Sequence, residues 1–332
     1  MDRILVTGGA GFVGSHVCKG LRRAGWTPVT FDNLATGWQD AVKFGPLLNG
    51  DILNRAAVGA AFAEWNPVAV IHLAALTSVE ESVSRPEAYR QCNVEGTRNV
   101  LDAMREHGCR AIVFSSTCAV YGNAASGLVT EQSSTNPESP YAETKLAAEE
   151  LIFDVSAGGG IGSMIFRYFN VAGSDPEQEI GERRRIPSNL IPAVLECAAG
   201  TQAVFEIFGT DLATPDGTCI RDFVHANDVA DAHILGLRAV LDGKVGGLFN
   251  LGTGKGNSVR EVVERSRLVT GIGFPVREAA RRPGDVARIV SDCARARAEL
   301  GWSAQSSQLE TIITDAWNWR RCEAYASPAG FG

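Results

Sequence analysis

The sequence predicts an α/β fold of the Rossmann type, in which a doubly wound parallel sheet is joined to a smaller C-terminal α/β domain. Three observations support this prediction. Short apolar runs alternate with helical periods through the first half of the chain, a glycine-rich turn joins the first run to the first helix, and an acidic residue ends the second run. Such alternation places helices on both faces of a parallel sheet.

Each predicted element follows from its residue pattern. Short apolar runs bounded by polar or glycine positions indicate strands, whereas longer segments with apolar residues three or four apart indicate helices. The predicted strands are residues 4–7, 29–31, 69–73, 111–115 and 161–168. The predicted helices are residues 12–24, 56–65, 86–107 and 141–157.

A chain of 332 residues is long enough for two domains. We expect residues 1–170 to form a dinucleotide-binding domain and residues 171–332 to form a substrate-binding domain. The sequence leaves open that segments after residue 221 pack back on the first domain. The basic triplet at residues 183–185 is interpreted as solvated surface rather than as a second phosphate site.

The composition is that of a globular protein and excludes several classes. Hydrophobic residues make up 45% of the chain and charged residues 21%, which suffices for a sizeable core. The 31 basic and 38 acidic residues give a net charge of −7, which argues against nucleic-acid binding. Because no apolar run approaches the ~18 residues of a membrane span, we expect no membrane partner.

Cysteine and histidine spacing argues against metal sites and disulfides. The eight cysteines are scattered without a C-x-x-C pair, and the five histidines show no H-x₃-H or H-E-x-x-H spacing. The amino terminus opens as a strand without the layout of a signal peptide. Together these features predict a cytoplasmic protein with reduced thiols and no bound metal.

The glycine-rich turn predicts a dinucleotide site. Gly8 permits a tight turn, Gly11 lets the backbone approach a pyrophosphate, and Gly14 packs the helix against the strand. The free amides at the start of that helix favour a diphosphate. Asp32 follows Gly14 by 18 residues, where a carboxylate binds a ribose diol and disfavours a 2′-phosphate, so NAD is predicted rather than NADP. Asp51 either contacts the adenine or is a plain turn residue.

Tyr141 and Lys145 are a candidate catalytic pair. Four residues apart, they share one face of the predicted helix. A unit charge ~4 Å away contributes about 4 kcal/mol at an effective dielectric near 20. We therefore expect the ammonium to lower the phenol pKa from its ordinary value of about 10 toward neutrality, where a general base works best. The alternative is a surface tyrosine beside a solvated lysine. Thr117 either bridges substrate and phenol or simply ends its strand.

Several motifs carry a family resemblance that extends over nearly the whole chain, residues 3–320. They occupy residues 7–14, 115–122, 141–145, 167–170, 186–190, 207–209, 215–222, 249–252 and 282–285. The early motifs resemble the extended short-chain dehydrogenase/reductase family. With the later motifs, the chain is similar to the UDP-glucose 4-epimerases of that family, which are also called UDP-galactose 4-epimerases.

The resemblance implies NAD as cofactor, a UDP-sugar as substrate and a role for each matching residue. Tyr141 is implied as general base and acid, Lys145 as the residue that holds the nicotinamide ribose, and Thr117 as an aid at the 4-hydroxyl. The positions that match NAD contacts are Gly8, Gly11, Phe12, Val13, Asp32, Asn33, Leu34, Asp51, Ile52, Leu73, Ala74, Ala75, Asn93, Ser115, Tyr141, Lys145 and Tyr168. The positions that match UDP-sugar contacts are Thr117, Asn170, Asn189, Leu190, Phe208, Arg221, Arg282, Asp285 and Ile289.

Three positions bear on which reaction to expect. Thr77 stands where the family commonly has a lysine, which puts one cofactor contact in doubt. Ile289 occupies a position whose side-chain size, in this family, limits the substituent at the sugar C2. An isoleucine there leaves open whether the site tolerates an N-acetyl group. Cys118 follows Thr117 where related dehydratases and decarboxylases have an acidic residue, which argues for epimerisation.

The expected function is therefore interconversion of UDP-glucose and UDP-galactose by transient oxidation at the sugar C4. Oxidation to a 4-ketone removes the stereocentre, and reduction from the other face restores it inverted. The alternatives are a 4-epimerase for a UDP-N-acetylhexosamine or UDP-pentose, a net oxidoreductase, or an NAD-binding regulator without catalysis. The resemblance also implies a homodimer that pairs through helices near residues 86–107 and 141–157.

Overall fold

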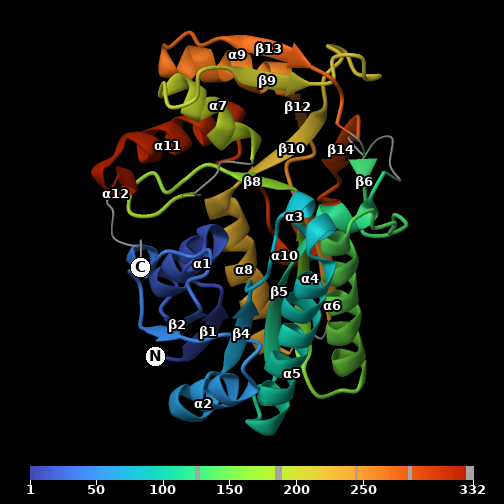
Figure 1. Ribbon diagram of the computed structural model, residues 1–332. Coiled ribbons are helices and arrows are strands. Elements are labelled where there is room, and N and C mark those ends of the chain that lie inside the picture. Colours follow the sequence, from blue (N-terminus) through green and yellow to red (C-terminus); the bar gives the residue numbers. More distant parts are fainter. Residues whose placement is uncertain (124–127, 184–188, 244–245, 283–285, 327–332) are drawn as a thin grey trace.

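A seven-stranded parallel sheet forms the larger part of the molecule, and a second α/β portion lies over one end of its strands (Figure 1). The computed structural model describes residues 1–123, 128–183, 189–243, 246–282 and 286–326. Within these residues, no helix is both long and apolar enough to cross a membrane.

The large sheet has the order β11-β7-β5-β4-β1-β2-β3, with every neighbouring pair parallel. From β1 the chain builds outward on one side through β2 and β3, and then on the other side from β4. Ligands bind at such a reversal, beyond the carboxyl ends of the strands. The strands are β1 (Arg3–Thr7), β2 (Thr27–Asp32), β3 (Leu47–Asn49), β4 (Ala69–His72), β5 (Ala111–Thr117), β7 (Gly162–Tyr168) and β11 (Gly247–Leu251).

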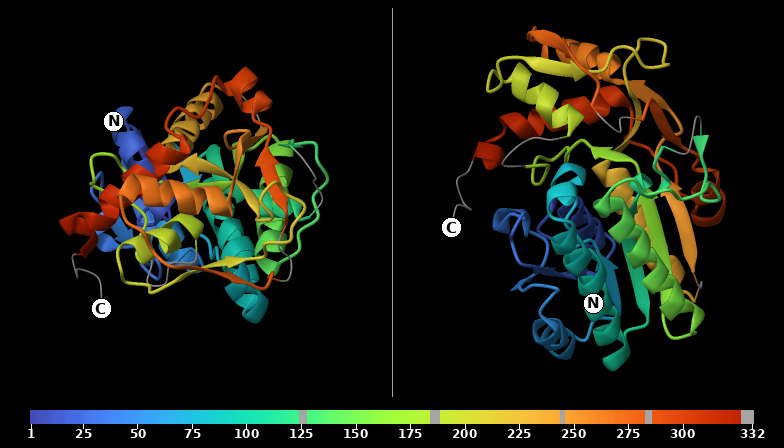
Figure 2. Two further views of the ribbon diagram at one scale, coloured as in Figure 1. Left: turned by 90° about the horizontal axis from the view of Figure 1, so that it is seen from above. Right: turned by 45° about the vertical axis from the view of Figure 1, so that its right-hand side comes forward.

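Helices cover both faces of this sheet because successive strand side chains point to opposite sides. Ile4 and Val6 of β1 pack in one core with α1 (Phe12–Arg23), α8 (Ala226–Leu241) and α10 (Ala294–Leu300). Leu5 packs in the opposite core, with α2 (Arg55–Trp65), α5 (Gly96–Glu106) and α6 (Pro140–Ala157). In the turned view of Figure 2, α5 and α6 lie side by side on the outside of the molecule.

The helix predicted over residues 86–107 is divided by a wider turn. It comprises α4 (Pro86–Arg90), a π-helical turn at η2 (Gln91–Glu95), and α5, and it follows the short helix α3 (Val79–Ser84). Single π turns inside helices occur frequently at functional sites. Here the π turn contains Asn93, one of the predicted cofactor residues.

The second portion contains a smaller sheet, a two-stranded pair and three main helices. The smaller sheet joins β12 (Gly256–Ser258), β10 (Ile220–His225), β14 (Arg288–Ser291) and β6 (Leu128–Val129), with β8 (Asn170–Ala172) beside β10. The pair is β9 (Phe205–Phe208) with β13 (Val276–Ala279). The helices are α7 (Leu190–Ala198), α9 (Val259–Thr270) and α11 (Leu309–Arg321), and α12 (Glu323–Ala326) and the 3-10 turns η1 (Gln39–Ala41) and η3 (Cys118–Tyr121) complete the described elements.

The two portions exchange strands. β11 and α8 follow residue 221 and belong to the large sheet and its cover, whereas β6 precedes α6 and belongs to the smaller sheet. The division at residue 170 stays a prediction. The sequence analysis did not predict β3 or β11, both of which are edge strands of the large sheet.

Candidate active site

The predicted cofactor and catalytic residues gather along the carboxyl ends of the large sheet. The ends of β1, β2 and β3 carry the glycine-rich turn and the acidic residues, and the ends of β4, β5 and β7 carry the residues around Tyr141. Of the remaining predicted cofactor positions, Phe12 and Val13 begin α1, Ile52 follows β3, and Leu73 and Ala75 follow β4.

The glycine-rich turn has the geometry that a dinucleotide requires. Gly8 has φ +74°, and its amide donates to the Phe31 carbonyl at 2.9 Å. A Cβ on Gly8 would lie 2.6 Å from the Ala74 nitrogen, and a Cβ on Gly14 would lie 2.1 Å from the Gly8 oxygen. A Cβ on Gly11 would meet only the Gly8 oxygen, at 3.3 Å. Gly8 and Gly14 are therefore needed by the fold, whereas Gly11 leaves room for a ligand.

The start of α1 is free to receive an anion. Gly11 is its N-cap residue and supplies no side-chain hydrogen bond to the first turn. The backbone amides of the first turn and the positive end of the helix dipole thus remain available to a diphosphate.

Two carboxylates lie at the carboxyl ends of the neighbouring strands β2 and β3: Asp32 is the last residue of β2, and Asp51 follows β3 by two residues. The Asp32 carboxylate accepts the Ala10 amide at 3.0 Å and the Leu34 amide at 2.9 Å. Burial raises the pKa of Asp32, and these two hydrogen bonds oppose that rise. Asn33 donates to the Asp51 carboxylate at 3.0 Å, which joins the two strand ends. This arrangement fits an adenosine ribose beside Asp32.

A buried hydrogen-bond chain runs from the end of β1 toward the helix of Tyr141, and the sequence analysis missed it. The Thr97 hydroxyl donates to the Asn93 carbonyl at 2.6 Å, so it accepts from Nε2 of His72 at 2.9 Å. Nδ1 of His72 is then an acceptor and takes the Thr7 hydroxyl at 2.6 Å. Burial lowers the pKa of His72 to about 3, so the ring stays neutral.

Asn93 extends this chain to α6. Its amide nitrogen donates to the Leu76 carbonyl and to the Thr144 hydroxyl, both at 3.0 Å, and its oxygen accepts the Leu76 amide at 2.8 Å. The Thr144 hydroxyl donates to the Tyr141 carbonyl at 2.9 Å. The π turn around Asn93 thus helps to fix the first turn of α6.

Tyr141 lies at the start of α6 and close to Thr117 at the end of β5. Burial, followed by the proximity of Tyr168, raises the pKa of Tyr141 above its ordinary value, whereas a hydrogen bond with Thr117 lowers it. The Tyr89 ring approaches Tyr141 edge-on, with centroids 6.4 Å apart. The prediction that Lys145 brings this pKa toward neutrality is wrong for the contacts that the structure describes, because the effect of burial prevails.

Lys145 lies in an apolar place. Its side chain is buried, with residue exposure of 4%, and its ammonium lies 4.2 Å from the centroid of the Phe114 ring. Burial lowers the pKa of Lys145 to about 8, and the Glu149 carboxylate opposes that shift. A buried lysine of this kind is typical of functional sites.

Two further buried groups support the site and were not predicted. Glu149 lies one turn beyond Lys145 and pairs with Arg167 of β7, whose Nε is 2.9 Å away. His233 of α8 donates from Nδ1 to the Val229 carbonyl at 2.8 Å, so its Nε2 accepts the hydroxyl of Ser115, a predicted cofactor residue, at 2.9 Å. The four-residue spacing from Lys145 was the available signal for Glu149, whereas His233 had none.

Some of the predicted substrate residues are brought together in the second portion. The Arg282 guanidinium lies 3.8 Å from the Phe208 ring centroid. Arg221 on β10 is the register partner of Ile289 on β14 and donates to the Val286 carbonyl at 2.7 Å.

The other predicted substrate residues have separate surroundings. Ile289 is buried in an apolar cluster that includes Val120 and Tyr121 of η3. Asn189 precedes Leu190 at the start of α7 and donates to the Glu182 carboxylate at 2.8 Å. Asn170 is exposed, and so is Thr77, the position at which the resemblance puts a cofactor contact in doubt. Asp285 lies outside the described residues.

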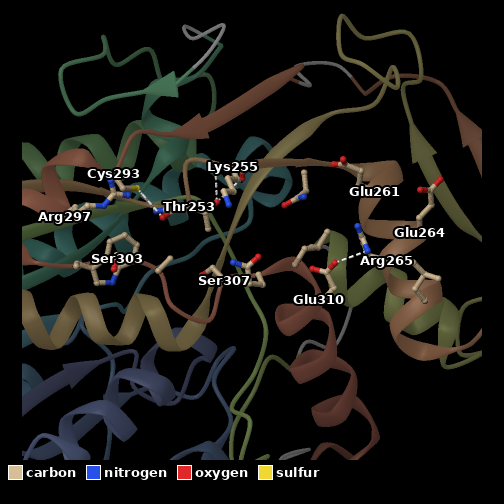
Figure 3. Close-up of a pocket in the computed structure, with 17 residues that line it drawn as sticks. Thr253, Lys255, Glu261, Glu264, Arg265, Cys293, Arg297, Ser303, Ser307 and Glu310 are labelled. Atoms are coloured by element: carbon tan, nitrogen blue, oxygen red, sulfur yellow. Dashed lines mark hydrogen bonds and ion pairs between the residues drawn. The ribbon is translucent and has the colours of Figure 1, made fainter.

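The hollow drawn in Figure 3 is separate from this site. It has a volume of about 580 Å³ and lies between α9, α10 and the start of α11, with Lys255, Arg265 and Arg297 among its lining residues. Among the residues that the structure describes, none of the predicted catalytic, cofactor or substrate residues lines it.

Comparisons with known proteins agree with one another. The model of the NAD dependent epimerase/dehydratase family matches residues 4–252. A UDP-glucose 4-epimerase of Rhizobium leguminosarum bv. trifolii is 41% identical over 318 residues, which cover 96% of this chain and 97% of that protein. The crystal structure of UDP-glucose 4-epimerase from Brucella ovis in complex with NAD has a TM-score of 0.93 and 42% identity, covering 96% and 98% of the two chains. The UDP-glucose-4-epimerase from Stenotrophomonas maltophila, with bound NAD and formylated UDP-arabinopyranose, has a TM-score of 0.95 and 38% identity, covering 98% and 100%.

Proposed function

The chain belongs to the NAD dependent epimerase/dehydratase family, and we propose that it is a UDP-glucose 4-epimerase that interconverts UDP-glucose and UDP-galactose. The observation that carries this proposal is the position of Tyr141. Its phenol lies beside Thr117 at the carboxyl end of β5 and on the same edge of the sheet as the glycine-rich turn. The reaction needs a proton acceptor and a hydride acceptor at one sugar carbon.

The residues at this edge fit NAD. Gly11 offers an open backbone approach, the start of α1 offers free amides, and Asp32 offers a carboxylate to the ribose. When bound, NAD supplies the hydride acceptor and, in its oxidised form, a positive charge. Lys145 would hold the nicotinamide ribose, and Asn93 would line the same end of the site.

Tyr141 would take the proton of the 4-hydroxyl and return it to the same oxygen after the 4-ketone has turned. Its pKa is high in buried, apolar surroundings. Electrostatic interactions are stronger in such low-dielectric surroundings than in water. A cation that enters beside the phenol would therefore lower its pKa more than it would in water. Thr117 would pass the hydroxyl proton between sugar and phenol, and Tyr168 and Ser115 would support the ring that accepts the hydride.

The UDP end would be held by the second portion while the hexose stays loose. Phe208 and Arg282 form a stacked pair that suits a uracil or a phosphate, and Arg221 lies near Ile289. A planar guanidinium binds phosphate oxygens in pairs. Firm binding at the non-reacting end retains the 4-ketone while the sugar turns, so that the hydride returns to the other face.

We also propose a homodimer in the cytoplasm. The pairing would use α5 and α6, which lie together on the outside of the large sheet (Figure 2). The eight cysteines are free thiols, which supports a reducing compartment.

Incubation with single UDP-sugars tests this function. We expect purified protein to convert UDP-glucose and UDP-galactose to the same mixture without net consumption of cofactor, resolved by chromatography. A panel with UDP-N-acetylglucosamine and UDP-arabinose shows whether the protein prefers another UDP-sugar. Continuous reduction of NAD with substrate would contradict epimerisation and favour the net oxidoreductase, and absence of any turnover with NAD retained would favour the regulator.

A further inference from the structure

Arg183 is not the solvated surface residue that the sequence analysis expected. It belongs to residues 175–183, a segment between β8 and α7 that we call the strap. The Arg183 side chain is only 10% exposed, and it donates to the Asp40 carboxylate at 2.9 Å and to the Ala324 carbonyl. These partners belong to opposite portions of the molecule, because Asp40 precedes β3 and Ala324 lies in α12.

Two indole rings enclose the Arg183 guanidinium. Its central carbon lies 4.8 Å from the Trp38 ring centroid and 5.9 Å from the Trp319 ring centroid. The Trp38 indole donates to the Arg183 carbonyl at 3.1 Å, and the Trp319 indole donates to the Glu182 carbonyl at 3.0 Å. A cation between aromatic faces is stabilised further as it loses water. We call Arg183, Trp38, Asp40 and Trp319 the clamp.

Ion pairs fasten the rest of the strap to the first portion. The Lys19 ammonium of α1 lies 2.6 Å from Asp175 and 2.7 Å from Glu177, and it also pairs with Glu179. The Lys43 ammonium donates to the Glu179 carbonyl at 2.5 Å. Figure 1 shows the strap as the yellow-green chain between α1 and α11.

The loop that the clamp holds is the loop beside the predicted ribose site. Residues 33–41 follow Asp32, and the Trp38 amide donates to the Ala10 carbonyl of the glycine-rich turn at 3.0 Å. A Cβ on Gly37 would lie 2.9 Å from the Ala10 Cβ, so the loop and the turn are in close contact. The Ala10 and Leu34 amides both donate to Asp32. A shift of Trp38 would therefore move the groups around Asp32.

We propose that Arg183 is a positioning residue for the cofactor: by clamping Trp38 and Asp40 it holds the loop over the adenosine half of the site and slows the release of NAD. This inference rests on the proposed NAD-dependent function. Arg183 contacts none of the residues around Tyr141 in the described structure. It should therefore affect how long NAD stays bound and leave the chemical step of the loaded enzyme unchanged.

Release of NAD from purified holoenzyme tests this inference. We expect Arg183→Gln to release NAD about 5- to 150-fold faster, the usual range for coupling between separate sites, with kcat at saturating NAD unchanged. Arg183→Lys should release NAD at a rate between those of wild type and Arg183→Gln, because lysine keeps the charge that pairs with Asp40 but loses the planar stack on the indole rings. Asp40→Asn, on a partly exposed carboxylate, provides a second variant if Arg183→Gln folds poorly. Arg277→Gln, at an exposed pair with Glu206, is the matched control.

The outcomes separate this inference from the proposed function. A wild-type protein that holds no NAD overturns the proposed function. A wild-type protein that retains NAD, with Arg183→Gln and Asp40→Asn releasing it at the wild-type rate, overturns the clamp alone. Arg183→Gln could instead lower the melting temperature and leave the NAD release rate, measured well below that temperature, unchanged. Arg183 would then have a purely structural role, and the proposed clamp would also be overturned. If a variant that carries both Arg183→Gln and Asp40→Asn releases NAD no faster than Arg183→Gln alone, the two residues act as one unit, as proposed.

Discussion

Tyr141 and Lys145 are close in sequence, but their side chains have different surroundings. The phenol lies near Thr117 and Tyr168, whereas the ammonium lies on the Phe114 ring. A general base can have a high pKa in the empty site and still work if a cation lowers that pKa once the ligands are bound. Here the ligands would be NAD and the UDP-sugar, and oxidised NAD would bring the cation. Under the proposed mechanism, proton transfer by Tyr141 would therefore depend on an occupied site.

Loss of the phenol should remove the chemistry and leave the cofactor. We expect Tyr141→Phe to lower kcat by about 10²- to 10⁴-fold, the range for general acid–base catalysis, because phenylalanine keeps the ring but has no proton to exchange. NAD content should match wild type, since the proposed NAD contacts are spread over many residues. Turnover by chromatography and NAD content by absorbance measure both. A variant with near-normal kcat would exclude Tyr141 as the base.

Lys145 should cost the protein stability at neutral pH. Its pKa is about 8 when folded, below the ordinary value near 10.4, so the unfolded chain binds the extra proton between these values. Stability therefore rises with pH across this window, and below pH 8 the buried charge is unfavourable by up to roughly 3 kcal/mol. We expect Lys145→Met to raise the melting temperature at pH 7, to do so less at pH 10, and to abolish activity.

Thermal unfolding at both pH values, with NAD removed, measures this effect. Lys255→Met replaces an exposed lysine and serves as the control, with little change at either pH. A Lys145→Met protein that is less stable than wild type at pH 7 would contradict the prediction.

At the residue scale, the sequence could predict the residues that are proposed to contact ligands but not the residues that hold these in place. Gly8, Asp32 and Tyr141 belong to local motifs with fixed spacing. His72 and Arg183 are defined by partners far along the chain, Thr97 and Asp40 among them. A single histidine or arginine carries no local sign of such partners, so tertiary contact alone identifies them.

At the scale of elements, the turn between β1 and α1 separates two roles of glycine. Gly14 is required by a contact within the turn and Gly8 by its φ of +74° and the nearby backbone of Ala74, whereas Gly11 has an ordinary extended conformation with φ −80° and ψ 176°. Alanine at these positions therefore tests different properties. Alanine at Gly8 or Gly14 should disturb the fold, whereas alanine at Gly11 should disturb ligand binding.

We expect Gly11→Ala to weaken NAD binding at least about tenfold while changing the free energy of unfolding by less than about 1 kcal/mol, the usual cost at an N-cap. Gly14→Ala should lower both the NAD affinity and the free energy of unfolding, because its Cβ would lie 2.1 Å from the Gly8 oxygen. Gly59→Ala in α2 is the control, since its Cβ would meet nothing within 4 Å, and it should stabilise by about 1 kcal/mol. Calorimetric titration with NAD and denaturant unfolding measure these effects; equal NAD affinity in Gly11→Ala and wild type would contradict the cofactor role.

Periodicity predicted most elements of the first half, and its failures have a physical cause. The strands at residues 4–7 and 111–115 are apolar on both faces and easily recognised. β3 is an edge strand of only three residues, too short to show a pattern, and the apolar run of the edge strand β11 is interrupted by Asn250. The π turn at Gln91–Glu95 is a single wider turn between two α-helical segments, too short to interrupt the apolar pattern, so the sequence predicted one continuous helix over residues 86–107.

At the scale of the whole molecule, the proposed dimer would bury an apolar surface. Phe153 of α6 is 37% exposed, and Val83 of the neighbouring α3 is 68% exposed. We expect Phe153→Glu to shift the protein from dimer to monomer in light scattering, because a charge there would lose its water on pairing. Leu268→Glu, at an α9 residue that is 73% exposed, is the control and should leave the mass unchanged. A wild-type monomer, or a Phe153→Glu dimer of unchanged strength, would contradict pairing through this face.

The exchange of strands between the two portions sets the order in which the molecule can be made. β11 pairs with β7 at the edge of the large sheet, and it ends at Leu251. A ribosome must therefore translate three quarters of the chain before the large sheet is complete. Domains that close early can fold while synthesis continues, but the large sheet must wait, with β7 as an open edge, for a strand that follows much of the second portion in the chain.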